Sequence, residues 1–367
     1  MKKTIIFGLL AVAALFASCS DKNTYTISAA FSGRAETKDS TAVFLYGDPK
    51  GTNFLDSTIV KDGKFTLKGI QEKPIMAYVG MLVADRYPMM LPVVLEGGNI
   101  SIKMNDNISV SGTPLNDRMK AENDSIDQRF ARLDQIYNAG LPSINDEEDQ
   151  QALELQVQEG HEKIMNGLVA FIKENIDNPL GSYFFINSAQ MLTPDRQKEI
   201  IAIMPEEAKA NEFVARLAAQ IEAAELTEIG RKFIDVNGIT PEGQQASLSD
   251  HAGKGKVVLV DFWASWCGPC IAEMPNVKKA YDAYKNKGFE IVGISLDGNK
   301  EAWAGAIKRY DMKWPQFSNL KGWDEPAAQA YGISSIPHTL LLDKDGIIIA
   351  KNLRGEEIAN KLKELLK

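Results

Sequence analysis

Two cysteines three residues apart are the residues of this sequence best suited to chemistry. They lie in the segment Trp266-Cys267-Gly268-Pro269-Cys270, after an apolar run and at the start of a helical pattern. Cysteines at this spacing can form a disulfide, and the free N–H groups at a helix N-terminus favour a thiolate. We therefore expect Cys267 to be a nucleophile with a pKa below the usual value of about 8.5, and Cys270 to be a shielded resolving thiol.

The two residues between the cysteines fit this chemistry. Gly268 leaves the approach to Cys267 open, and Pro269 suits the first helical turn, where its missing N–H costs nothing. The alternatives are a static disulfide and half of a metal site. A disulfide that closes so small a loop adds little stability, and no further metal ligands lie nearby in the sequence. We expect a redox-active disulfide that needs no metal and no bound cofactor.

The region that must position these cysteines, residues 231–367, alternates apolar runs with helical patterns. Strands are expected at 256–263, 289–296, 339–342 and 347–350, and helices at 268–286, 299–310, 325–331 and 355–366. Strands that alternate with helices, followed by a hairpin and a last helix, indicate an α/β sheet covered on both faces.

Two further regions precede this α/β domain. Residues 24–112 contain short alternating runs between turn residues, which predicts an all-β accessory module, a small sandwich or an open barrel. Within it, Asp62-Gly63 between two such runs predicts a hairpin. Residues 113–230 are poor in glycine and carry apolar residues at helical spacing, which predicts a helical segment. Neither region shows a catalytic constellation, so we expect an accessory or docking role.

Composition excludes several classes of protein. The chain has 367 residues, of which 44% are hydrophobic and 25% charged, so it is neither mainly disordered nor a multi-span membrane protein. Its length suits two or three domains. The formal net charge of −8, with no basic block, disfavours nucleic acid as a partner.

The first residues read as an export signal. A positive start is followed by an apolar stretch over 4–16 and by Ala17-Ser18-Cys19, which resembles a lipobox although Phe16 departs from its usual aliphatic residue. This predicts a lipoprotein signal peptide over 1–18, acylation of Cys19 as a lipid anchor, and a tether over 19–23. We expect a lipoprotein of a Gram-negative cell envelope that faces the periplasm. The alternative is an ordinary signal peptide and secretion into the periplasm.

Two segments of the α/β domain resemble a known family. The run from Val260 to Cys270 is similar to the active-site segment of thioredoxin, and Tyr331 to Pro337 resembles the thioredoxin segment that ends in a cis-proline. The spacing between them resembles the TlpA/ResA-like branch of thioredoxin-fold proteins. The order of β module, helical segment and C-terminal domain resembles multidomain lipoproteins of Bacteroides-type bacteria. This implies a thioredoxin-like fold for 231–367 and thiol–disulfide oxidoreductase activity.

The resemblance also implies roles around the disulfide. Cys267 matches the attacking cysteine and Cys270 the resolving one. Pro337 matches the cis-proline beside the disulfide, so the backbone of Ile336 would bind an extended substrate chain. Trp266, together with Trp263, would wall the site and exclude water.

Two acidic residues match functional positions of the family. Asp261 matches the buried aspartate, whose raised pKa would suit proton exchange with Cys270. Glu273 matches a glutamate near the thiols of ResA-like proteins, with a plain exposed glutamate as the alternative. There are two departures: Gly293 stands where thioredoxin has a lysine near its aspartate, and His338 follows the proline, where it would either polarise the site at acidic pH or be exposed and idle.

Three functions are compatible with these motifs. Gly-Pro between the cysteines resembles reducing members of the superfamily, so we expect reduction of disulfides in exported proteins, with electrons from a membrane donor of DsbD or CcdA type. A thiol peroxidase of AhpC/TSA type is the first alternative, although such sites have threonine where this chain has Ala264. The second is a partner-binding assembly lipoprotein in which 24–230 does the main work and the dithiol is a redox latch.

Overall fold

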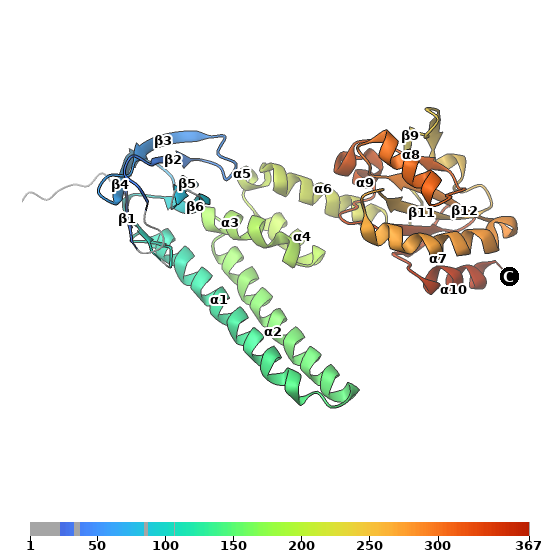
Figure 1. Ribbon diagram of the computed structural model, residues 1–367, viewed down its shortest axis with the longest axis horizontal. Coiled ribbons are helices and arrows are strands. Elements are labelled where there is room, and N and C mark those ends of the chain that lie inside the picture. Colours follow the sequence, from blue (N-terminus) through green and yellow to red (C-terminus); the bar gives the residue numbers. More distant parts are fainter. Residues whose placement is uncertain (1–22, 33–36, 84–86, 106, 367) are drawn as a thin grey trace, which may run out of the picture. The chain divides into compact units, whose positions relative to one another are not determined.

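The computed structural model describes residues 23–32, 37–83, 87–105 and 107–366 (Figure 1). The predicted signal peptide over 1–18, the acylated Cys19 and most of the tether therefore lie outside the described residues. The chain divides into two compact units, Met1–Glu206 and Glu207–Lys367, and each is described by itself. Every helix in the described part of the chain is either too short or too polar to span a bilayer.

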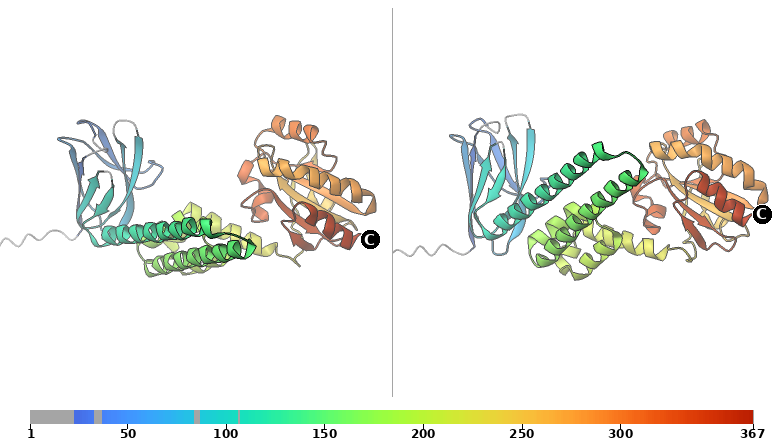
Figure 2. Two further views of the ribbon diagram at one scale, coloured as in Figure 1. Left: turned by 60° about the horizontal axis from the view of Figure 1, so that its bottom comes forward. Right: turned by 90° about the horizontal axis from the view of Figure 1, so that it is seen from below.

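The β region of the first unit is a sandwich of two four-stranded sheets (Figure 2). The sheets have the strand orders β4-β1-β7-β8 and β3-β2-β5-β6, and buried residues of both, such as Ile27 and Val43, form one core between them. The all-β prediction for this region is confirmed. The strands are β1 (Thr24–Phe31), β2 (Ala42–Tyr46), β3 (Phe54–Ile59), β4 (Lys64–Ile70), β5 (Ile75–Val83), β6 (Tyr87–Leu95), β7 (Gly98–Met104) and β8 (Ser109–Ser111).

The turn at Asp62-Gly63 reverses the chain but does not join two strands of one sheet. Both residues have positive φ, and next to them Lys61 and Lys64 form an isolated antiparallel bridge. Beyond that bridge β3 pairs with β2, whereas β4 pairs with β1 in the other sheet. The predicted hairpin is therefore wrong beyond its turn. Turn chemistry is local, whereas the pairing partner of β4 is set by the burial of residues such as Phe65 in the sandwich core.

The helical region of the first unit begins with a long antiparallel pair. These helices are α1 (Pro114–Gly140) and α2 (Glu147–Glu174), and α2 starts where the side chain of Asp146 accepts a hydrogen bond from Asp149 N. The predicted helical segment is confirmed. The shorter helices that follow are α3 (Pro179–Ser188) and α4 (Pro194–Ile203), and the short α5 (Glu206–Lys209) begins at the last residue of this unit.

The second unit is built on a five-stranded sheet of order β13-β12-β11-β14-β15. Its central strand β11 is parallel to β12 and antiparallel to β14, and helices lie on both faces of the sheet (Figure 1). The predicted α/β fold is confirmed. A two-stranded sheet and five helices complete the unit; the elements are α6 (Glu212–Leu226), β9 (Asn237–Ile239), β10 (Gln245–Ser247), β11 (Val257–Trp263), α7 (Gly268–Tyr284), β12 (Phe289–Ser295), α8 (Lys300–Arg309), β13 (Gln316–Phe317), α9 (Pro326–Ala330), β14 (His338–Leu342), β15 (Ile348–Lys351) and α10 (Glu356–Leu365).

The centre of this sheet fixes the position of the cysteines. Every residue of β11 is buried, which explains its nearly continuous apolar run. The strand ends at Trp263, and α7 begins only five residues later, at Gly268. The start of α7 is therefore held at one end of the most buried strand of the sheet, which is a rigid base for an exchange site.

Candidate active site

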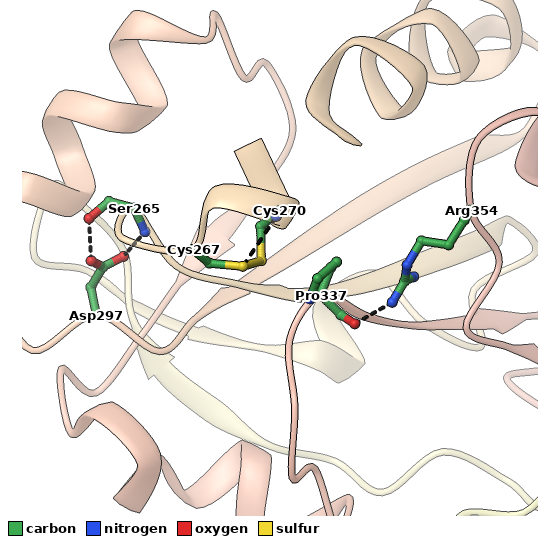
Figure 3. Close-up of a disulfide and its surroundings, with 6 residues drawn as sticks. All are labelled: Ser265, Cys267, Cys270, Asp297, Pro337 and Arg354. Carbon is green, nitrogen blue, oxygen red and sulfur yellow. Dashed lines mark hydrogen bonds between the residues drawn. A yellow bond between two sulfur atoms is a disulfide. The ribbon is translucent and has the colours of Figure 1, made fainter. Parts of the chain in front are cut away.

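Cys267 and Cys270 are joined by a disulfide at the N-terminus of α7 (Figure 3). Cys267 is the N-cap residue, and its Sγ accepts a hydrogen bond from Cys270 N at 3.2 Å. It keeps 5% of its surface exposed, whereas Cys270 is fully buried. In the reduced protein a thiolate at this sulfur position would face the free N–H groups of the first turn, which stabilise negative charge. The arrangement therefore suits an attacking Cys267 and a shielded Cys270.

The segment before β14 carries the proline that the resemblance singled out. The Ile336–Pro337 peptide bond is cis. Pro337 lies in the surroundings of the disulfide, and Ile336 is half-buried (Figure 3). Since Pro337 directly precedes β14, which pairs with β11, the sheet that positions the cysteines also positions this segment.

Asp261 is a buried carboxyl group in the middle of β11. It is 2% exposed, and its Oδ2 has no hydrogen-bond partner within the described part of the chain. Burial raises the pKa of Asp261 from its ordinary value of 3.8 to about 7; the positive charge of Arg354 opposes this rise and the negative charge of Glu273 adds to it. A carboxyl group with such a pKa can accept and return a proton near neutral pH.

Glu273 connects α7 to the loop before α10. It is half-buried; its Oε1 accepts a hydrogen bond from Gly355 N at 2.5 Å, and its Oε2 accepts one from Asn276 Nδ2 at 3.3 Å. It is therefore held in place and electrostatically coupled to Asp261, rather than being the plain exposed glutamate of the alternative reading.

The two tryptophans near the disulfide differ in exposure. Trp263 is fully buried, and its Nε1 donates to Gln316 Oε1 at 3.0 Å. Trp266 is 55% exposed, with its ring centroid 6.3 Å from that of Trp323, which is 47% exposed. Trp266 is thus part of an exposed aromatic pair in the loop that precedes Cys267, and its shielding of the site from water stays a prediction.

A buried aspartate after β12 fixes the loop in front of Cys267. Asp297 is 1% exposed and accepts hydrogen bonds from Ser265 N at 2.9 Å and Ser265 Oγ at 2.5 Å (Figure 3). It also accepts one from Ser295 Oγ at 2.7 Å. Sequence reasoning missed this residue. The available signal was an aspartate directly after the second apolar strand, where parallel strands bring their carboxyl ends together.

Arg354 is the second residue that sequence reasoning missed. Its guanidinium donates a hydrogen bond to the carbonyl oxygen of Pro337 (Figure 3). It also donates to Leu353 O at 2.9 Å and to Thr339 Oγ1 at 3.2 Å. It lies 17 residues after the proline, on a loop without a recognisable motif. The only hint was Gly293, which stands where thioredoxin has a lysine near its buried aspartate. This difference leaves Asp261 without the neighbouring cation that the resemblance implies.

His338 is neither exposed nor a cation at neutral pH. It is half-buried, with its ring 6.3 Å from that of Phe262. Burial, together with the positive charges of Lys351 and Arg354, lowers the pKa of His338 from 6.5 to about 4. The reading of an exposed and idle side chain is therefore wrong.

Comparisons with known proteins cover both the α/β unit and the β sandwich. Residues 228–366 match the Redoxin family, and residues 25–119 match a domain of unknown function, DUF4369. A thiol–disulfide oxidoreductase ResA of Bacillus thuringiensis subsp. konkukian is 36% identical over 143 residues, which cover 39% of this chain and 79% of that protein. The ResA of Oceanobacillus iheyensis is 41% identical over 101 residues, or 28% of this chain and 50% of that protein.

Among solved structures, the thioredoxin domain of a thiol–disulfide oxidoreductase from Bacteroides vulgatus is 37% identical, with a TM-score of 0.36, and the match covers 38% of this chain and 99% of that one. The Bacillus relative exceeds 30% identity and is matched over most of its length. The Redoxin match over 228–366 includes the disulfide and the cis-proline. By this relationship the chain belongs to the ResA-like thiol–disulfide oxidoreductases of the thioredoxin fold.

Proposed function

We propose that the protein is a reductase for disulfides of exported proteins, with Cys267 as the nucleophile. The observation that carries this proposal is the placement of the disulfide: Cys267 caps α7 and retains a small exposed surface, while Cys270 lies buried one turn inside. The Cys267 thiolate attacks one sulfur of the target disulfide and displaces the other as a thiolate. A mixed disulfide between Cys267 and the target results.

The second step releases the target. The Cys270 thiolate attacks Cys267 Sγ, the target sulfur leaves as a thiolate, and the protein disulfide forms again. The target gains two electrons and the protein dithiol loses them, so the redox-active disulfide needs no bound cofactor. Asp261 accepts the proton of Cys270, because its pKa of about 7 leaves much of it ionised at neutral pH.

The target is held as an extended chain against the segment before β14. The backbone of Ile336 forms the contact, and Pro337 keeps the target sulfur close to Cys267. The exposed pair of Trp266 and Trp323 offers apolar surface next to the nucleophile for the neighbouring residues of the target. The negative charge of Glu273, on α7, raises the pKa of Asp261.

The site of action in this proposal is the periplasmic face of a Gram-negative cell envelope. The support is the export signal in the sequence, with Cys19 as the acylated anchor, and the relationship to ResA proteins. Each turnover leaves the dithiol oxidised, so an electron donor of DsbD or CcdA type in the membrane restores it. Residues 24–230 select or present targets.

The proposal is tested by trapping the mixed disulfide with the Cys270→Ser variant of the full chain. The variant can attack but cannot resolve, so target proteins should accumulate on Cys267 and be released by a reductant. The matched control is Cys267→Ser, which should trap no target through residue 267. Equal capture by both variants, or none by Cys270→Ser, would contradict the proposed roles.

A further inference from the structure

Arg354 links the segment at Pro337 to the loop after β15. Its guanidinium carries five N–H donors in a fixed plane. Three acceptors surround it: the carbonyl oxygens of Pro337 and Leu353 and the hydroxyl of Thr339. The side chain therefore holds the loop after β15 against the start of β14, at the proline that borders the disulfide (Figure 3).

The positive charge of the same guanidinium acts on the buried carboxyl of Asp261 in β11. Thr339, which Arg354 contacts, is the sheet partner of Asp261 on β14. The partner of Asp261 on the other side is Gly293 of β12, and a Cβ at that position would lie 2.2 Å from Gln316 Oε1. Since the side chain of Gln316 occupies that space, β12 places no charge opposite Asp261, and the cation comes from the β15–α10 loop.

The titratable groups around Asp261 come from α7, the loop before α10 and β14. Glu273 on α7 raises the pKa of Asp261, and Arg354 lowers it. On β14, His338 is neutral near pH 7, because burial and the charges of Lys351 and Arg354 hold its pKa near 4. The guanidinium of Arg354 stays protonated at every relevant pH. It is therefore the fixed positive charge that favours ionised Asp261.

We propose that Arg354 is a positioning residue that couples the substrate-binding segment to proton exchange: it fixes the carbonyl of Pro337 and keeps Asp261 ionised for the release step. This inference rests on the proposed reductase mechanism. Two measurable consequences follow. Without Arg354 the segment at Pro337 is less well held, so protein substrates bind less tightly. Without its charge Asp261 ionises at higher pH, so Cys270 is deprotonated less readily near neutrality.

The test uses the reduced full chain and Ellman's disulfide in a stopped-flow experiment. The first thiol released reports attack by Cys267, and the second reports resolution by Cys270. In Arg354→Gln the pH midpoint of the second phase should move up by about one pH unit, the size expected for a lost opposite charge. The KM for insulin disulfides should rise about threefold or more, because a charged hydrogen bond is lost. The matched control is Arg309→Gln, at an exposed position on α8.

Two further variants separate charge, geometry and folding. Arg354→Lys keeps the positive charge but loses the planar guanidinium with its several donors. Its pH midpoint should therefore lie close to that of the unaltered protein, whereas its KM should be raised nearly as much as that of Arg354→Gln. It also keeps the test decisive if Arg354→Gln folds poorly. In an Asp261→Asn background, Arg354→Gln should cause no further shift of the midpoint.

The proposal is overturned if Arg354→Gln matches the Arg309→Gln control in both midpoint and KM, or if the shift persists without Asp261. If the unaltered protein releases no thiol from Ellman's disulfide, the reductase proposal itself fails. The two failures are therefore distinguishable.

Discussion

At the scale of single residues, the site depends on one buried carboxyl with opposing charged neighbours. Asp261 has an unpaired Oδ2 in the centre of the sheet, Arg354 favours its ionised form and Glu273 disfavours it. A buried carboxyl without hydrogen bonds destabilises a fold when it is charged. The proposed proton exchange with Cys270 would account for its presence in a fully buried strand.

We predict that Asp261→Asn stabilises the oxidised protein at alkaline pH and slows it as a catalyst. The pKa of Asp261 in the folded state is about 7, above its ordinary value of 3.8. The free energy of unfolding therefore has its full value below pH 3.8, and the part that depends on protonated Asp261 is lost as the pH rises through 7. Asparagine removes this loss, which amounts to at most about 4 kcal/mol. Urea unfolding at pH 4 and pH 8.5 measures it.

The expected gain from Asp261→Asn appears only at pH 8.5, while the release phase slows at pH 7. The control is Asp345→Asn, at an exposed turn position. A gain of equal size at both pH values would show that ionisation of Asp261 is not the cause.

We predict that Glu273→Gln moves the pH midpoint of the release step to lower pH. The negative charge of Glu273 raises the pKa of Asp261, so its removal makes Asp261 ionise more easily. This direction is opposite to that expected for Arg354→Gln. Stopped-flow release from Ellman's disulfide across pH 5–9 measures both. A shift of Glu273→Gln to higher pH would contradict the charge arrangement described around Asp261.

At the scale of elements, the sequence predicts the features that neighbouring residues encode. It does not predict the contacts between residues that are far apart in the chain. The buried run of β11, the cysteines at the start of α7 and the alternating strands of the sandwich could all be predicted from neighbouring residues. The pairing of β3 and β4 could not, because the turn at 62–63 is local and the choice of sheet is not. Asp297 and Arg354 were missed for the same reason: their partners Ser265 and Pro337 are distant in the sequence.

We predict that Asp297→Ala destabilises the α/β unit and weakens the nucleophile. The substitution leaves the Ser265 N–H and the Ser295 hydroxyl without their acceptor in a buried place, at a cost of about 2 kcal/mol or more. The loop before Cys267 then loses its anchor. Thermal unfolding and the alkylation rate of Cys267 measure the two effects. Asp324→Ala is the control, and unchanged alkylation in a folded Asp297→Ala protein would contradict the positioning role.

At the scale of the whole molecule, α6 packs as part of the α/β unit. The compact unit begins at Glu207, whereas the boundary at residue 231 stays a prediction from sequence. Gly332 has a φ of +62°, and a Cβ there would lie 2.5 Å from Gln220 O of α6. Lys351 of β15 pairs with Glu228 just beyond the helix, at 3.0 Å. The helix therefore supports the segment that leads to the cis-proline.

We predict that a fragment of residues 207–367 is more stable than one of residues 231–367. Loss of the α6 contacts should lower the Tm by roughly 5 °C or more. Gly332→Ala serves as a matched probe, since its backbone strain is common to both fragments. It should cost more in the longer fragment, where Gln220 occupies the space. Equal Tm values and equal costs of Gly332→Ala would show that α6 does not support the unit.

Cys267 is expected to be a thiolate near neutral pH because it caps α7. The rate of its alkylation by iodoacetamide as a function of pH, in the reduced full chain with Cys270→Ser, measures this. The titration midpoint should lie well below the value of about 8.5 of a free thiol. A midpoint at or above 8.5 would contradict the role of Cys267 as the activated nucleophile.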